Sequence, residues 1–430
     1  MIGIISVFFA FSLVIFVHEF GHFYVGKRCG IGVKEFSIGF GPKILWFKDR
    51  SGVIWKFCLL PFGGFVKFEG DADFSSSNRM IDELNTSPKL FHEASIKARF
   101  LTVLAGPFAN LVFSVFVFSS LIFFNGITND APIIGKVDTS PFQNLNLQRG
   151  DMILSVNNTP TNSFSDIYLE YSKVGEDKEL ELLVKRDKQT FSIIVYNLFQ
   201  PVVKNVELLS PASRAGILVG DIILNVNGVG ISSFAELKNF VQASKGKPLV
   251  LNIWRDEKEI EKTIMPKIRP MEKSDGSIEE TLRIGIIGGF ALEPERKTPG
   301  LFLTLKIGLL TTGKVVSGSI KGLIEIVKGS ISPKHLSGPI GIAHAITDVS
   351  KNGISPFFSL VALISTGIAV INLFPLPILD GGHLLLLIYE KLTGASPSAG
   401  FMHVFTLFGL LLILSLMLFA TYNDLLRIIF

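Results

Sequence analysis

The chain opens on a long apolar stretch that ends in a charged tetrad: residues 2–22 read IGIISVFFAFSLVIFVHEFGH. A run of this length can cross the hydrocarbon core of a bilayer, so it predicts a membrane-spanning helix. His18 and His22 are four residues apart and share one helix face, so both can reach a single cation, with Glu19 available as a general base. An ionisable residue inside a span costs on the order of 2.5–3.5 kcal/mol. We therefore expect a metal site within a membrane, although the polar end of a signal anchor would give the same pattern.

The composition is too apolar for an ordinary soluble protein. Of the 430 residues, 48% are hydrophobic, and the formal net charge is +4, with a mean hydropathy of +0.46. No basic run with interleaved aromatic residues is present, so we expect no nucleic-acid partner. The only cysteines are Cys29 and Cys58, which form no C-x-x-C pair, so neither a disulfide framework nor a cysteine zinc site is indicated.

Four apolar stretches, at about 1–26, 98–125, 357–390 and 401–430, are each long enough to cross a bilayer. Lysine and arginine residues near the ends of the first two spans predict that residues 27–97 are cytoplasmic and residues 126–356 lie outside. Residues 300–330 carry Leu301, Leu305 and Leu309 among four lysines. That pattern favours an amphipathic helix at the outer membrane face over a fifth span.

The outer segment contains a repeat with an offset of about seventy residues. RGDMILSVNN at 149–158 parallels VGDIILNVNG at 219–228, and Arg186-Asp187 parallels Arg255-Asp256. Both copies resemble the PDZ domain, the second more closely through SPASRAGILVGD at 210–221. The resemblance implies that peptide ends or extended segments add to a sheet edge. Two spacers that only block access are the alternative.

Residues 33–70 are β-prone and interrupted by glycine and proline, as in VKEFSIGFGP (33–42) and WKFCLLPFGGFVKF (55–68). They predict a membrane-associated β-hairpin whose exposed edge could take up an unwound substrate as an extra strand. A plain surface hairpin is the alternative.

A catalytic zinc site needs a third protein ligand. The strongest candidate lies in NLFPLPILDGG at 372–382, where two prolines break the third apolar stretch. Asp380 is a carboxylate there with no cation nearby in sequence, and a bound metal would supply the partner. An aspartate at a helix terminus near the membrane interface is the alternative.

Taken together, these motifs resemble the site-2 protease family, in particular its bacterial branch with periplasmic PDZ domains. The resemblance rests on HEFGH (18–22), SIGFGP (37–42), PFGG (61–64), AGPFAN (105–110), SGPIGIA (337–343) and the segment 372–380.

The resemblance implies a role for each matching residue. His18, His22 and Asp380 would bind Zn²⁺, and Glu19 would activate the zinc-bound water. Asn372 would hold the substrate strand or polarise its carbonyl. We also expect substrate contacts from Asn110, Gly63 and Gly64, although Asn110 could instead belong to helix packing through Gly106 and Pro107. His383 is not expected to bind the metal.

We therefore predict a polytopic α-helical membrane protein with about four transmembrane helices, a membrane-associated β-hairpin region and two tandem PDZ-like α+β domains. The expected parts are an N-terminal membrane core (1–126), PDZ-like domains (127–200 and 201–270), a linker with the amphipathic helix (271–356) and a C-terminal membrane core (357–430).

The predicted function is that of an intramembrane zinc metalloprotease in the cell inner membrane, with its active site toward the cytosol. By the same resemblance, it would cleave the transmembrane segments of single-span proteins, such as anti-sigma factors or remnant signal peptides. A non-enzymatic membrane PDZ scaffold and a metal or proton transporter are the alternative functions.

Overall fold

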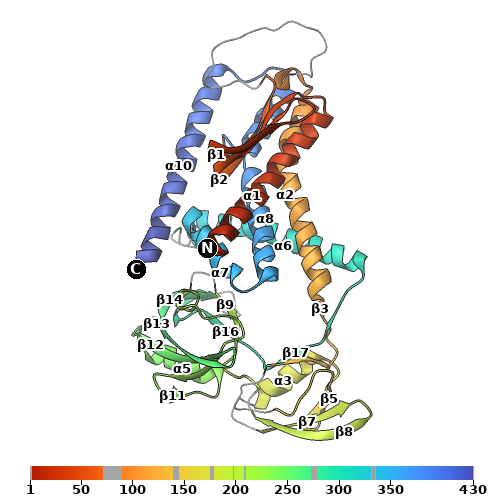
Figure 1. Ribbon diagram of the computed structural model, residues 1–430, viewed down its shortest axis with the longest axis vertical. Coiled ribbons are helices and arrows are strands. Elements are labelled where there is room, and N and C mark those ends of the chain that lie inside the picture. The colour runs from red at the N-terminus through yellow and green to blue at the C-terminus, as the bar shows by residue number, and fades with distance from the viewer. Residues whose placement is uncertain are drawn as a thin grey trace. The chain divides into compact units, whose positions relative to one another are not determined.

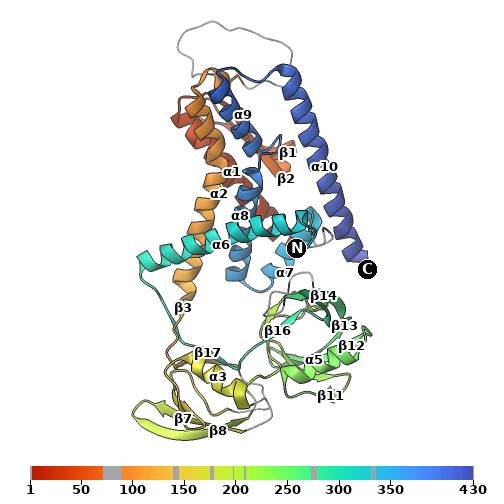
Figure 2. The same ribbon diagram turned by 180° about the vertical axis from the view of Figure 1, so that it is seen from behind.

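The computed structural model describes residues 2–70, 90–138, 145–174, 179–196, 198–207, 210–272, 278–330, 333 and 336–429. It divides into two compact units (Figures 1 and 2). The first unit comprises Met1–Ile122 with Gly300–Phe430, and the second comprises Phe123–Pro299.

The first unit is built mainly of apolar helices. In the part of the chain that the structure describes, five of them are long and apolar enough to cross a membrane. They are α1 (Ile2–Arg28), α2 (Ile96–Asn125), α6 (Leu301–Val327), α8 (Ile354–Asn372) and α10 (Ala399–Ile429). The shorter helices are η1 (Phe91–Glu93), α7 (Pro339–Ser350) and α9 (Asp380–Thr393). The prediction of a multi-pass membrane protein is confirmed.

Helix α6 differs in direction from the other long helices. It runs crosswise to α1, α2 and α8 (Figures 1 and 2). Small residues face its neighbours: Thr304 and Thr312 are buried, and a Cβ at Gly308 would lie 3.0 Å from the backbone nitrogen of Ser119 on α2. Length and composition count α6 among the possible spans, and its direction sets it apart from α1, α2 and α8.

The N-terminal half of α1 is held by α7 and α8. Ala10 and Val14 of α1 form a buried cluster with Ile346 of α7 and Val361 of α8. This packing fixes α1 so that the tetrad at its C-terminal half faces the interior of the unit.

The β-prone segment forms strands β1 (Val33–Lys48) and β2 (Ile54–Phe68), which fold into more than a simple hairpin. Each residue from Glu35 to Ile38 has one partner in 54–57 and a second in 64–67, while 43–48 pairs with 54–58. The sheet thus has four segments, with 43–48 and 64–68 at its edges. It lies against α1 through an aromatic cluster in which Phe36 and Trp55 contact Phe23.

The third apolar stretch is broken where its prolines predict. Helix α8 ends at Asn372, and α9 begins at Asp380. Between them, Ile378 has φ +78°, which is a strained conformation for a β-branched residue. A Cβ at Gly381 would lie 2.5 Å from the carbonyl oxygen of Leu373, so only glycine lets this turn pack onto the first turn of α9.

The second unit contains two repeats of one plan. The first has the sheet order β6-β5-β7-β8 with helix α3, and the second has β11-β10-β12-β13 with helix α5. The elements of the first repeat are β4 (Ile134–Val137), β5 (Met152–Val156), β6 (Thr159–Pro160), α3 (Phe164–Val174), β7 (Glu179–Arg186) and β8 (Gln189–Tyr196). Those of the second are β9 (Val203–Val206), α4 (Pro211–Ala215), β10 (Ile222–Val226), β11 (Val229–Gly230), α5 (Phe234–Ala243), β12 (Leu249–Arg255) and β13 (Lys258–Ile264).

The same ion pair stabilises both repeats. Arg186 makes two hydrogen bonds to the carboxylate of Asp151, at 2.7 and 2.8 Å. Arg255 makes two to Asp221, at 2.6 and 2.7 Å. The Gly-Asp and Arg-Asp matches in the sequence therefore correspond to one repeated structural contact.

The expected boundary after residue 270 is wrong. Following β14 (Lys267–Glu272) and β15 (Ile278–Arg283), the strand β16 (Ile286–Gly288) pairs with β9 of the second repeat. Then β17 (Leu292–Pro294) pairs with β4 of the first repeat, and β18 (Arg296–Lys297) pairs with β3 (Ile127–Thr128). The chain thus completes both repeats after residue 270. Pairings between segments so far apart leave no local periodicity in the sequence.

Candidate metal centre

Three side chains from α1 and α9 bring their donor atoms together. The Nε2 atoms of His18 and His22 are 3.3 Å apart. The carboxylate oxygens of Asp380 lie 3.2 Å from Nε2 of His18 and 3.5 Å from Nε2 of His22. Among the described residues, this is the one group of histidine, cysteine and acidic side chains that could hold a metal ion.

The distances fit zinc. In a tetrahedral site with bonds of about 2.0–2.1 Å, neighbouring ligand atoms lie roughly 3.3 Å apart. The 3.3 Å between the two imidazole nitrogens matches one edge of such a tetrahedron, and each of these nitrogens has a different oxygen of Asp380 at 3.2 or 3.5 Å. Two imidazoles and one carboxylate also form a donor set that is typical of catalytic zinc, in which the fourth position stays open.

Helix α2 orients both histidines. Nδ1 of His22 donates to the carbonyl oxygen of Thr102 at 2.8 Å, so its Nε2 has no proton and is free to bind a metal. Nδ1 of His18 lies 3.4 Å from the side-chain amide of Asn110. The Oδ1 atom of Asn110 is buried and has no hydrogen-bond partner among the described residues. Turning this amide over would let Oδ1 accept the Nδ1 proton of His18, which is the arrangement a metal-bound His18 requires.

Glu19 lies next to the three donors and beside the β-sheet. It is 9% exposed and close enough to His18, His22 and Asp380 for electrostatic interaction. A Cβ at Gly64 would lie 3.0 Å from Cγ of Glu19. The edge segment 64–68 therefore passes directly beside the proposed base.

The other predicted site residues divide into two groups. Asn372 ends α8 with its Nδ2 atom 3.2 Å from Nε2 of His18, so it lies beside the three donors. Gly63, with φ +113°, instead faces the ring of Phe40, so its contact is with the sheet. His383 is exposed and lies outside the metal group. Thr102 was not predicted, because it acts through a backbone carbonyl, which every residue has.

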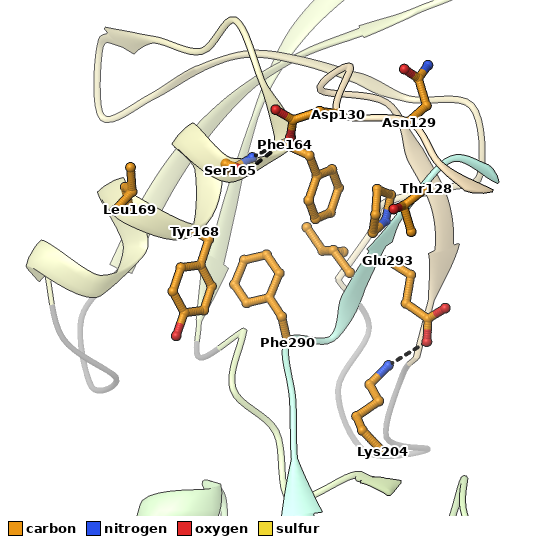
Figure 3. A pocket seen from close by; sticks show the side chains of 12 residues that line it. Thr128, Asn129, Asp130, Phe164, Ser165, Tyr168, Leu169, Lys204, Phe290 and Glu293 are labelled. Carbon is orange, nitrogen blue, oxygen red and sulfur yellow. Dashed lines mark hydrogen bonds and ion pairs between the residues drawn. The ribbon is translucent and has the colours of Figure 1, made fainter. Parts of the chain in front are cut away.

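A second candidate site lies in the second unit. A groove of about 750 Å³ is lined by α3 on one side and residues 290–294 on the other. Figure 3 shows Phe164 and Tyr168 of α3 beside Phe290, with Lys204 paired to Glu293 at 3.0 Å. A similar groove of about 700 Å³ lies between α5 and residues 281–288. Each repeat thus has a groove between its long helix and a strand from residues 281–294, later in the chain.

Known proteins with similar sequences include proteases. The chain is 31% identical over 456 residues to the regulator of sigma-E protease RseP of Salmonella typhimurium, which covers 97% of each chain. The RseP protein of Escherichia coli is 30% identical over 459 residues, again with 97% of each chain covered. A protein of Mesorhizobium japonicum, provisionally named as a zinc metalloprotease, is 30% identical over 427 residues, covering 97% of this chain and 96% of the relative.

Among solved structures, the PDZ domain of an SdrC-like protein from Listeria monocytogenes matches 22% of this chain and 92% of its own, at 20% identity. Its TM-score of 0.18 supports no argument about the fold. The model of peptidase family M50 matches residues 6–416. The chain therefore belongs to the site-2 proteases of family M50, and it is an intramembrane zinc metalloprotease.

Proposed function

We propose that His18, His22 and Asp380 hold the zinc ion and that Glu19 is the general base. The observation that carries this proposal is that the two imidazole nitrogens lie 3.3 Å apart, each with one oxygen of Asp380 at 3.2 or 3.5 Å, next to the buried carboxylate of Glu19. When bound, zinc lowers the pKa of a coordinated water toward about 7 and polarises a carbonyl. The Glu19 carboxylate would accept the proton of the attacking water and pass it to the leaving amine.

The substrate in this proposal is an unwound transmembrane segment. A helix hides its peptide carbonyls in internal hydrogen bonds, so it must open before it can be cleaved. The edge segment that begins at Gly64 would pair with the opened segment as an added strand, which brings a peptide bond beside Glu19. The amide of Asn372 would donate a hydrogen bond to the substrate carbonyl, in line with its position 3.2 Å from Nε2 of His18.

The active site in this proposal faces the cytosol. Helix α1 ends in Lys27 and Arg28, which the positive-inside rule assigns to the cytoplasm. His18 precedes Arg28 by ten residues, or about 15 Å of helix, roughly half of the hydrocarbon thickness. Water would therefore reach the metal from the cytosolic side. The three lysines of α6 and its crosswise direction suit the opposite, outer surface.

The two repeats would serve as PDZ-like peptide-binding domains on the outer side. Each presents a strand edge opposite a helix with a groove between them, which is the arrangement that lets a peptide add to a sheet. Apolar side chains line the first groove, including Phe164, Tyr168 and Leu292. Such grooves would select among single-span substrates before cleavage.

Two of the relatives are named as regulators of sigma-E. We infer that the substrates are single-span membrane proteins of this regulatory class, such as anti-sigma factors, together with remnant signal peptides.

Purified protein tests the proposal directly. Wild type should bind one zinc ion and cleave a single-span test substrate in detergent or lipid. Glu19→Gln should bind zinc equally well and lose cleavage, since only the base is removed. His383→Ala is the matched control: this exposed histidine is three residues from Asp380 on α9, and its loss should change neither property. Full cleavage by Glu19→Gln, or wild type without zinc, would overturn the assignment.

A further inference from the structure

The first turns of α2 contact His22 directly. The carbonyl of Thr102 accepts the Nδ1 proton of His22 at 2.8 Å. Thr102 is fully buried, and its own hydroxyl donates to the carbonyl oxygen of Ala98. One helical turn further along, a Cβ at Gly106 would meet the imidazole ring. The direction of the His22 ring therefore depends on where this part of α2 lies.

The same part of α2 is joined to the far end of α9. Arg99 makes two hydrogen bonds to the carboxylate of Glu390, at 2.7 Å from one guanidinium nitrogen and 3.1 Å from the other. The two side chains are 12% and 18% exposed. Nε of Arg99 donates to the carbonyl oxygen of Ala94, which fixes the guanidinium plane from its own side. A two-point contact of this kind sets both the position and the rotation of the helix that carries the carboxylate.

Asp380 and Glu390 lie at opposite ends of one short helix. Helix α9 has 14 residues, and Glu390 follows Asp380 by ten residues, or about 15 Å of helix. Gly381, Leu384 and Leu387 are buried, so the inward face of α9 continues toward Glu390. Its other face exposes Leu385, Ile388 and Tyr389. A helix that packs through one face only can slide or rotate unless a polar contact fixes it. Because α9 is one continuous helix, a movement at Glu390 is transmitted to Asp380.

Fold stability alone does not account for this ion pair. Burying a guanidinium and a carboxylate costs desolvation energy that often cancels their attraction, so such pairs contribute little net stability. Their best-documented contribution is to specify one register over others. Here the register is that of α9 relative to α2, and hence that of Asp380 relative to His22.

We propose that Arg99 and Glu390 are positioning residues of the metal centre, which set the distance between the carboxylate of Asp380 and the imidazole of His22. This inference rests on the proposed ligand set. Within four residues of α2, Thr102 would orient one ligand directly and Arg99 would place another through α9.

Zinc affinity tests the proposal with conservative variants of the full-length protein. Arg99→Lys keeps the charge but loses the two-point contact, and Glu390→Asp keeps the carboxylate but shortens its reach. Each should weaken zinc binding about tenfold in a chelator competition, the scale found when a group supporting a metal ligand is lost. The visible absorption of the cobalt-loaded protein should change as well, because it reports ligand geometry. The thermal midpoint of the zinc-free protein should stay near that of wild type.

Two further variants make the outcome decisive. The double variant Arg99→Glu with Glu390→Arg restores the ion pair with its charges exchanged and should recover part of the zinc affinity. This recovery is also expected where one of the single variants folds poorly. Lys351→Ala removes an exposed ion pair with Asp348 at the end of α7 and should leave zinc binding unchanged. Wild-type zinc affinity and cobalt spectrum in both conservative variants would overturn the inference. If wild type itself binds no zinc, the ligand assignment fails instead.

Discussion

Gly106 offers the sharpest test of the metal centre, because a single methyl group there would meet the imidazole of His22, one of the proposed ligands. A Cβ at this position would lie 2.5 Å from Cε1 and 2.7 Å from Cδ2 of His22. Ordinary contact begins at 3.4 Å, so in Gly106→Ala the ring must retreat by about 0.9 Å. Zinc sites tolerate deviations of about 0.2 Å in ligand distances.

The displacement therefore exceeds the tolerance several times over, and His22 should cease to bind the metal. We expect zinc affinity to fall by at least about 100-fold, or about 2.7 kcal/mol, the upper end of effects seen for supporting residues. The imidazole is the free end of a side chain and can turn aside, so the fold should survive. Alanine also favours a helix over glycine by about 1 kcal/mol.

The assay is a chelator competition for zinc, together with thermal unfolding of the zinc-free protein. Gly367→Ala in α8 is the matched control, because a Cβ there meets nothing within 4 Å. It should leave zinc affinity unchanged. Zinc affinity in Gly106→Ala equal to that of the control would refute the assignment of His22 as a ligand in this geometry.

Three other outcomes follow from the contacts of single residues. Asn110→Ala should weaken zinc binding about tenfold, because the imidazole of His18 loses its supporting amide; unchanged affinity would mean that the amide serves packing alone. Gly64→Val should abolish cleavage, because the added side chain would meet the carbonyl oxygen of Ser37 at 2.7 Å and Cγ of Glu19 at 3.0 Å and so push the sheet edge away from the base; retained cleavage would count against this edge as the substrate site. Burial alone would raise the pKa of Asp151, but its ion pair with Arg186 outweighs this and holds the pKa below its usual value. A carboxyl whose pKa is lowered by folding stabilises the folded state at pH values above its unfolded pKa of about 3.9. This stabilisation is lost as the pH falls from there through the folded pKa. Hydrogen exchange in residues 145–196, corrected for intrinsic rate, should therefore accelerate between pH 5 and pH 3, and less so in Asp151→Asn.

The local features of the site could be predicted from the sequence. Four-residue spacing places His18 and His22 on one helix face whatever the rest of the fold does. The prolines of 372–382 end α8 and start α9, which predicts a carboxylate at a helix start inside the membrane. The repeat was visible because Asp151 and Asp221 fulfil the same contact with an arginine near the end of each copy. Membership in family M50 also leaves no basis for the scaffold and transporter alternatives.

Long-range pairing could not be predicted in the same way. Arg99 and Glu390 are 291 residues apart, and each alone resembles an ordinary interfacial charge. Strands β16 and β17 have too few residues to show a period, and their partner strands lie 80 or more residues earlier in the chain. The double pairing of residues 35–38 likewise depends on how the chain turns back twice. A single sequence records the residues at both ends of such contacts but not their association.

The segment 105–110 shows why helix packing and ligand support need not be alternatives. In a bilayer, lipid tails are as apolar as leucine, so close packing of small residues and polar contacts hold helices together. A Cβ at Gly21 of α1 would lie 2.8 Å from both the carbonyl carbon of Ala105 and the Cβ of Ala109, so α1 and α2 touch nearly backbone to backbone. Only at that separation can Asn110 come within 3.4 Å of His18 and the carbonyl of Thr102 within 2.8 Å of His22. A larger residue at Gly21 should therefore weaken zinc binding without touching a ligand, because it would move both supporting groups out of reach together.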